Sequence, residues 1–160
     1  MTKRYLMFLA MIATSVVAMF VMTYLNSWEL GHATWSETRF YMVLYMGAAM
    51  AIIMLAFMWG MYPNRALNIT IFAGAVVLFT MALWLVRSQA TVGDISWMRA
   101  MIPHHSIAIL TSSRAQLSDP RVRKLADGII KAQELEIREM KALIADLEGG
   151  PKATPELDGK

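Results

Sequence analysis

Three long apolar runs, almost without charge, occupy the first half of the chain. They cover residues 5–25, 40–62 and 67–86. A helix rises about 1.5 Å per residue and the hydrocarbon core of a bilayer is about 30 Å thick, so each run is long enough to cross it. The pattern therefore predicts three transmembrane helices in a membrane domain at residues 1–87, with the lipid bilayer as its surroundings.

Beyond residue 87 the pattern changes to charged and apolar residues at helical spacing. It predicts a helix over residues 95–116 with Asp94 as its N-cap. A second helix is predicted over residues 120–148, because Asp119 is a good capping residue and Pro120 is favoured at the first helical position. These helices define a second domain at residues 94–148.

The short connection between the two polar helices predicts an antiparallel hairpin. The second helix carries an apolar stripe that two polar residues interrupt. The stripe comprises Val122, Leu125, Ile129, Gln133, Glu136, Met140, Leu143 and Leu147. A turn near Ser118 places Met101 of the first helix level with Glu136 of the second. The polar residues 149–160 that follow are predicted to be a disordered tail.

The potential metal ligands of the chain gather in this hairpin. On the first helix Met98, Met101 and His105 fall within an arc of about 60°, whereas His104 points about 100° away from His105. Thioether and imidazole groups together favour a soft metal, copper above all. The Glu136 carboxylate is placed to bind metal or to orient a metal-bound histidine. The candidate ligands are Met98, Met101, His104, His105, Glu136 and Met140.

The same residues allow an interpretation without metal. A carboxylate in a helix interface needs a hydrogen-bond partner, and an imidazole can supply it. The polar cluster would then fix the register of the hairpin, with Met98 and Met101 as ordinary core residues. In that case the hairpin is a structural or interaction module.

Two other features contain potential metal ligands but favour another interpretation. The second apolar run has methionines at intervals of four, which would suit either a copper conduit or helix packing. They are Met42, Met46, Met50, Met54 and Met58. Packing is favoured because no ionisable group accompanies them inside the run, and the pairs Gly47–Ala51 and Ala56–Gly60 supply small residues for close helix contact. His32 lies alone in the loop at residues 26–39 and is predicted to be solvated.

Composition narrows the function classes further. The chain is 57% hydrophobic and 17% charged, and a net charge of +3 is too small and too scattered for a nucleic-acid surface. Cysteine is absent, which excludes disulfides, thiolate metal sites and a cysteine nucleophile. No nucleophile arrangement or complete di-iron motif is present, so an enzyme is not expected.

The distribution of Lys and Arg predicts the orientation in the membrane. Lys3, Arg4 and Arg65 fall on one side of the apolar runs, whereas the first loop has only Arg39. The positive-inside rule therefore predicts a cytoplasmic N terminus. The first run lacks a cleavage site and is predicted to be retained, so three crossings place the hairpin outside. The expected location is the bacterial inner membrane, with the C-terminal domain periplasmic or extracellular.

Three segments closely resemble the family known as domain of unknown function 305. They are WMRAMIPHH (97–105), DPRVRKLA (119–126) and QELEIREM (133–140). The resemblance covers about a third of the chain. It implies a ferritin-like helical fold in exported or membrane-attached bacterial proteins, some of which bind copper through Met and His. It also implies Met98, Met101, His104, His105 and Met140 as ligands.

The chain departs from the commoner family pattern directly after the histidine pair. The family often has Gln at the position of Ser106, and an Asp-Met pair often follows where this chain has Leu110 and Thr111. Fewer ligands are therefore available here than in the commoner pattern.

Together these observations predict an all-α protein. Three transmembrane helices precede an exported ferritin-like hairpin, which dimerisation completes to a four-helix bundle because one hairpin has too little core by itself. The predicted function is membrane-anchored copper binding or copper homeostasis in the cell envelope, with a homodimer and a copper-handling protein as partners. The alternative is a module without metal that docks onto another membrane protein.

Overall fold

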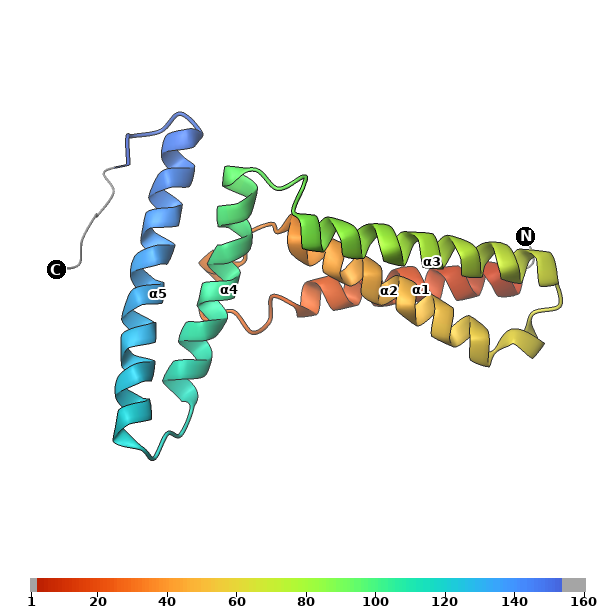
Figure 1. The fold of residues 1–160 in the computed structure, drawn as a ribbon, viewed down its shortest axis with the longest axis horizontal. Helices are drawn as coiled ribbons and strands as arrows, with labels where there is room; N and C mark the ends of the chain where they lie inside the picture. The colour runs from red at the N-terminus through yellow and green to blue at the C-terminus, as the bar shows by residue number, and fades with distance from the viewer. Residues whose placement is uncertain (1–2, 154–160) are drawn as a thin grey trace. The chain divides into compact units, whose positions relative to one another are not determined.

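The computed structural model describes residues 3–153, and within this range the regular structure is helical (Figure 1). The α-helices are α1 (Lys3–Met22), α2 (Glu37–Phe57), α3 (Arg65–Ser88), α4 (Asp94–Arg114) and α5 (Pro120–Leu147). Two short 3₁₀ helices, η1 (Leu30–His32) and η2 (Trp59–Met61), lie in the connections. The predicted all-α class is confirmed.

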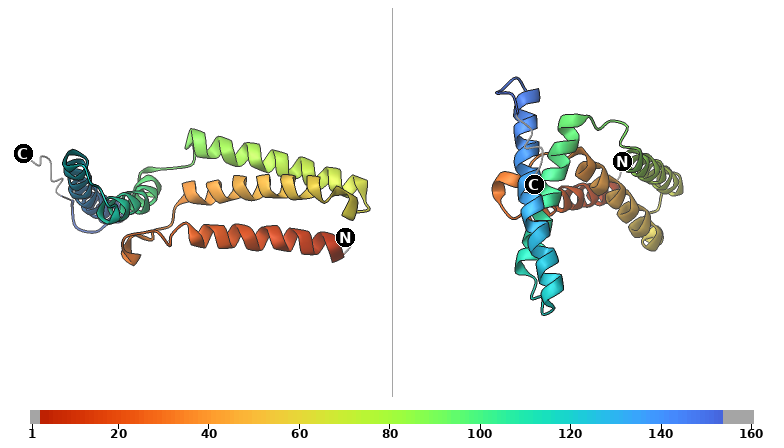
Figure 2. Two further views of the ribbon diagram at one scale, coloured as in Figure 1. Left: turned by 90° about the horizontal axis from the view of Figure 1, so that it is seen from below. Right: turned by 60° about the vertical axis from the view of Figure 1, so that its left-hand side comes forward.

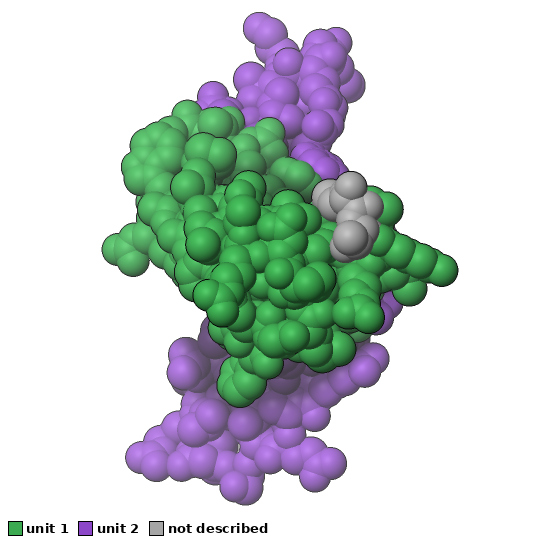
Figure 3. Space-filling model, turned by 90° about the vertical axis from the view of Figure 1, so that its right-hand side faces the viewer, with its two compact units in different colours: residues 1–23, 37–91 green, residues 24–36, 92–160 purple. Residues whose placement is uncertain are grey.

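The chain forms two compact units, which Figure 3 shows in different colours. Unit 1 consists of residues 1–23 and 37–91, and unit 2 of residues 24–36 and 92–160. Unit 2 therefore contains the first loop as well as the hairpin. The predicted membrane domain at residues 1–87 includes this loop, whereas the structure places residues 24–36 in unit 2.

The three helices of unit 1 are long and apolar enough to cross a membrane, as predicted. Helix α2 lies between α1 and α3, and the three run side by side (Figure 2). Helix α2 ends at Phe57, earlier than the predicted limit at residue 62. The chain tightens there into η2 before Pro63, a residue that cannot continue a helix.

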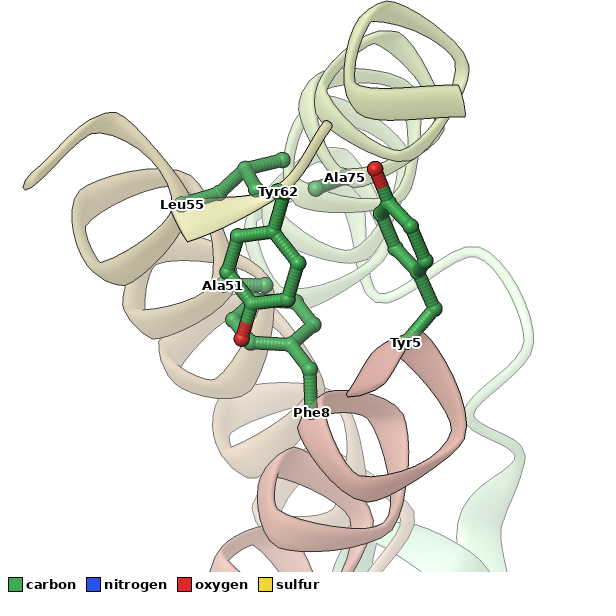
Figure 4. Packing of buried hydrophobic residues seen from close by; sticks show 6 residues of the cluster. All are labelled: Tyr5, Phe8, Ala51, Leu55, Tyr62 and Ala75. Atoms are coloured by element: carbon green, nitrogen blue, oxygen red, sulfur yellow. The ribbon is translucent and has the colours of Figure 1, made fainter. Parts of the chain in front are cut away.

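Aromatic side chains fix one end of unit 1. Tyr62 packs against Tyr5 and Phe8, with ring centroids 5.0 and 5.6 Å apart respectively (Figure 4). The Tyr5 hydroxyl donates to Asn68 Oδ1 at 2.7 Å, and Asn68 Nδ2 donates to the Tyr62 carbonyl at 3.1 Å. The buried Asn68 amide is therefore satisfied at both ends, and it ties the start of α1 to the start of α3.

Helices α1 and α2 approach each other closely at Gly47. A Cβ atom at this position would lie 2.2 Å from Val16 Cγ2, whereas at Gly60 it would meet open space. Ala51 is also buried. The expected role of Gly47 and Ala51 in helix contact is confirmed. The same expectation for Ala56 and Gly60 is wrong, because both are exposed and Gly60 lies in η2, beyond the end of α2. The methionines Met54 and Met58 pack against the core of unit 1, as the packing interpretation predicts.

The Gly47 contact predicts opposite effects for two matched substitutions. Gly74→Ala in α3 has open space and should be neutral or stabilising, because alanine favours helix by about 1 kcal/mol over glycine. Gly47→Ala should destabilise unit 1 by roughly 1–3 kcal/mol through overpacking against Val16, whose side chain has few alternative rotamers. Thermal unfolding of both variants in mild detergent checks this. Equal shifts in the midpoint would contradict the close approach.

The helices of unit 2 form the expected antiparallel hairpin (Figure 1). The Asp119 side chain accepts from Arg121 N at 2.8 Å and Pro120 begins α5, as predicted. The prediction of Asp94 as an N-cap is wrong by one residue. Gly93 is the N-cap, and Asp94 lies in the first turn of α4, where its negative charge suits the positive end of the helix.

The core of the hairpin is apolar and includes three methionines. Its buried and partly buried members are Met98, Met101, Ile102, Ile109, Ile130, Ile137, Met140 and Ile144. The predicted stripe of α5 is only partly correct, because Met140 of the stripe lies in the core together with Ile130, Ile137 and Ile144, which are outside the stripe. Five apolar residues of the stripe stay exposed within one chain, namely Val122, Leu125, Ile129, Leu143 and Leu147.

The C-terminal segment of unit 2 folds back onto the end of α5. Ala153 N donates to Asp146 Oδ2 at 3.0 Å, and Gly149 adopts a positive φ of 89° just beyond the helix. A left-handed residue at this position is a common way to end a helix. Of the tail predicted to be disordered (149–160), residues 154–160 lie outside the described residues.

Candidate functional site

Three of the predicted ligands meet in the core of the hairpin. Met98 and Met140 are buried, at 5% and 6% exposure, and Met101 packs beside them. The side chains come from two helices, with Met98 and Met101 one turn apart on α4 and Met140 on α5. The structure thus brings three thioether groups into one apolar cluster.

His105 and Glu136 join the two helices next to this cluster. His105 Nε2 lies 2.7 Å from Glu136 Oε2, and its Nδ1 lies 3.0 Å from the Met101 carbonyl oxygen. Gln133 Nε2 donates to the same carboxylate at 3.3 Å. The predicted meeting of Glu136 with the ligand cluster is confirmed. Its partner is His105, one helical turn beyond the position predicted to be level with it.

The His105 geometry determines which nitrogen is available to a metal. Both ring nitrogens face oxygen acceptors, so a ring with both hydrogens satisfies both contacts. When Nδ1–H donates to the Met101 carbonyl, Nε2 is the nitrogen that can bind a metal. A metal at Nε2 would take the place of the contact that this nitrogen makes with Glu136. The carboxylate would then stand beside the metal-bound ring.

His104 is not part of this cluster. Its side chain is exposed, and its ring centroid lies 6.3 Å from that of His105. The two histidine side chains therefore point in different directions, as predicted. Residues 3–153 contain no group of three or more His, Asp or Glu side chains placed to hold a metal ion. A metal in the hairpin would thus depend on the methionine sulfurs.

The expectation that His32 is solvated is wrong. His32 is 6% exposed, and its Nδ1 lies 3.0 Å from Ser106 Oγ on α4. Ser106 is fully buried and also accepts from Trp28 N at 2.7 Å, while Thr34 Oγ1 donates to the Arg99 carbonyl at 2.6 Å. We call these contacts of residues 28–34 with α4 the loop latch. They explain why the first loop belongs to unit 2.

The loop latch favours a neutral His32. Ser106 Oγ accepts from Trp28 N–H, and its own hydrogen can be donated to His32 Nδ1 when the ring hydrogen is on Nε2, which lies 3.5 Å from Glu29 Oε2. Burial lowers the pKa of His32, the positive charge of Lys141 lowers it further, and Glu29 opposes both. The one sequence signal for this site was the small hydroxyl residue Ser106 where the family pattern often has Gln.

The acid–histidine–serine order in the loop latch invites comparison with a nucleophilic triad. Such a triad needs a serine oxygen that a substrate can reach. Ser106 has no exposed surface, and a backbone N–H of the loop occupies its oxygen. These three side chains therefore act as a structural contact between loop and hairpin.

Comparison with known proteins agrees with the resemblance found in the sequence. Residues 85–156 match the sequence model of the family described as Domain of unknown function (DUF305). An uncharacterized protein of Acanthamoeba polyphaga mimivirus is 31% identical over 142 residues, which cover 84% of this chain and 91% of that protein. The chain belongs to the DUF305 family.

The two matches cover different parts of this DUF305 protein. The family match contains α4 and α5 and hence the His105–Glu136 pair. The viral match is longer than unit 2, so the relative also shares sequence with the apolar helices of unit 1. No solved structure matches the chain.

Proposed function

We propose that this DUF305 protein is a membrane-anchored copper-binding protein of the cell envelope, which holds Cu(I) or passes it to a copper-handling partner. The observation that carries the proposal is the cluster of three methionines beside the His105–Glu136 pair in the α4–α5 interface. The proposed role is binding and transfer, without catalysis.

The chemistry of the donors suits Cu(I). Thioether sulfur is a soft ligand that prefers Cu(I), and imidazole nitrogen also binds copper. Met98, Met101, Met140 and His105 would hold the ion, and the Glu136 carboxylate, which lies beside His105 Nε2, would balance its charge. The surrounding isoleucines exclude water from the sulfurs and so favour an ion of low charge.

Metal analysis of the full-length protein tests this function. The protein is purified in mild detergent without a histidine tag, loaded with Cu(I) under reducing conditions and then desalted. We expect about one copper per chain and little zinc after the same treatment with Zn(II). A protein that retains no copper would support the alternative function.

The alternative is a structural or interaction module that docks onto another membrane protein. One observation favours it. His105, Glu136 and Gln133 already satisfy one another without a metal, so the polar group can simply fix the register of the hairpin. Copper loading separates the two functions, because this module requires no metal.

We further propose that α1, α2 and α3 span the bacterial inner membrane, with the N terminus in the cytoplasm. The basic residues Lys3, Arg4 and Arg65 near one end of unit 1 support this orientation. Reporter fusions after Gly150 should therefore be active for alkaline phosphatase and inactive for a cytoplasmic fluorescent protein. Activity of the cytoplasmic reporter alone would reverse the orientation.

A second copy of the chain is the proposed partner of the hairpin. The exposed apolar residues of α5, including Leu125 and Ile129 at 64% and 38% exposure, would pack in a four-helix bundle of two hairpins. Leu125→Glu with Ile129→Glu should convert a detergent-solubilised dimer to a monomer, as measured by light scattering. Lys131→Glu, at an exposed position of the same helix, is the charge control, because it lowers the net charge by the same two units. A wild-type protein that is monomeric in membranes and in detergent would exclude this assembly.

A further inference from the structure

A cleft of ≈ 920 Å³ opens in unit 1 between the start of α1 and the segment that follows α2. Phe8 and Tyr62, which pack against each other, form part of its wall. The residues that matter for binding are two cations and four methionines, namely Lys3, Arg4, Met7, Met11, Met58 and Met61. Its volume is in the range of small-molecule sites in proteins, about 300–1,000 Å³.

The two cations of the cleft have no acidic side chain to neutralise them within unit 1. The sequence of this unit contains a single acid, Glu37, which begins α2, whereas Met58 and Met61 follow the end of that helix. A helix of this length separates its ends by about 30 Å. The positive charge at the cleft is therefore uncompensated by unit 1.

Arg4 is held at the cleft in a position suited to an anion. Its Nη1 donates to the Met61 carbonyl oxygen at 3.3 Å, which connects α1 to η2. A guanidinium group has five N–H donors, so this bond leaves others for a phosphate. Lys3 precedes Arg4 on the same turn. The cleft thus has two basic groups at one end and an apolar wall along the rest.

We propose that this cleft binds one anionic phospholipid. The headgroup phosphate contacts Lys3 and Arg4, and an acyl chain lies along the methionines, whose flexible side chains adapt to an irregular apolar ligand. A copper site at these methionines is disfavoured because the two cations repel a metal ion. The proposal depends on the membrane insertion proposed above and is independent of copper binding in the hairpin.

Native mass spectrometry of the full-length protein in mild detergent tests the proposal. We compare retention of phosphatidylglycerol with that of phosphatidylcholine of the same acyl chains. The wild type should retain one phosphatidylglycerol in preference. Lys3→Gln and Arg4→Gln should each weaken this binding roughly fivefold, since one basic residue near an anionic surface contributes about 1 kcal/mol.

Arg65→Gln is the matched control, because Arg65 begins α3 and does not line the cleft. It should leave the preference unchanged. Met11→Trp leaves the charges unchanged but fills the apolar part of the cleft, so it should abolish the retention of phosphatidylglycerol. The helicity of this variant, measured by circular dichroism, should stay intact. Soluble glycerol phosphate should not displace the lipid.

Three results would overturn the proposal. The first is equal retention of phosphatidylglycerol and phosphatidylcholine, and the second is a loss of preference in Arg65→Gln as large as in Arg4→Gln. The third is full displacement of the lipid by glycerol phosphate, which would indicate a site for the anion alone. Failure of membrane insertion is recognised separately, because the protein would then be soluble without detergent. Loss of copper binding would leave the lipid result unaffected.

Discussion

Replacing Met98 and Met101 together by leucine is expected to lower the affinity of the protein for Cu(I) by roughly 100-fold or more, since removing even a residue that only orients a ligand costs about 10–100-fold. Both thioethers lie in the cluster beside His105. Leucine has a similar volume and no polar group, so the hairpin should keep its fold. Zn(II) affinity should change much less, because zinc prefers the imidazole and the carboxylate.

Competitive titration against a chromogenic Cu(I) chelator measures this effect in the full-length protein. The matched control is Met42→Leu with Met46→Leu, two methionines of α2 that lie outside unit 2. The control should bind copper as the wild type does. Unchanged affinity in the Met98 and Met101 variant, with intact helicity, would assign both residues to packing and favour the interaction module.

The same titration separates the two histidines. His105→Ala should weaken Cu(I) binding far more than His104→Ala, because only His105 adjoins the methionine cluster in one chain. Glu136→Gln should lower the affinity by about tenfold, because it keeps the shape of the side chain but removes the negative charge beside the ion. A larger loss for His104→Ala would place the metal at an interface with another chain.

Much of this fold could be predicted because its elements depend on local signals. Run length alone predicts the three apolar helices, and the Asp119–Pro120 cap predicts the start of α5. The meeting of Glu136 with His105 also follows from sequence, since a short turn forces two helices to run antiparallel. Met101 is the residue predicted to lie level with Glu136, whereas the carboxylate contacts His105, one helical turn further along α4. The connection between the helices has no regular structure that would define the register to the residue.

The rotation of α5 and the loop latch could not be predicted in this way. Ile137 and Leu143 are equally apolar, and only the position of α4 decides that Ile137 is buried and Leu143 exposed. His32 is buried through a contact with Ser106, 74 residues away in the chain. A loop has no periodicity that would reveal such a partner. Its burial is a property of the tertiary fold.

Ser106→Ala is expected to destabilise unit 2 by about 1–3 kcal/mol, the cost of leaving buried polar groups without a partner. The change removes the acceptor of Trp28 N–H and the contact of His32 Nδ1. Ser113→Ala is the matched control, because the Ser113 hydroxyl is exposed and bonds only to the Leu110 carbonyl of its own helix. Thermal unfolding gives the loss of stability, and chymotrypsin cleavage at Trp28 and Trp35 reports release of the loop.

The loop latch should also make stability depend on pH. Burial, reinforced by Lys141, lowers the pKa of His32 in the folded chain, whereas in the unfolded chain it is near 6.5. Below this value the unfolded chain binds a proton that the buried ring resists, so protonation favours unfolding. The contribution of His32 to the free energy of unfolding therefore has its full value above about pH 6.5, and it decreases as the pH falls toward the folded pKa.

The unfolding midpoint of the wild type should thus fall more between about pH 7.5 and 5.5 than that of His32→Gln, whose other titratable groups are the same. If the unfolding midpoints of the two proteins fall in parallel with pH, His32 has the same pKa in the folded and the unfolded chain. The loop latch would then contribute hydrogen bonds to stability but no dependence on pH.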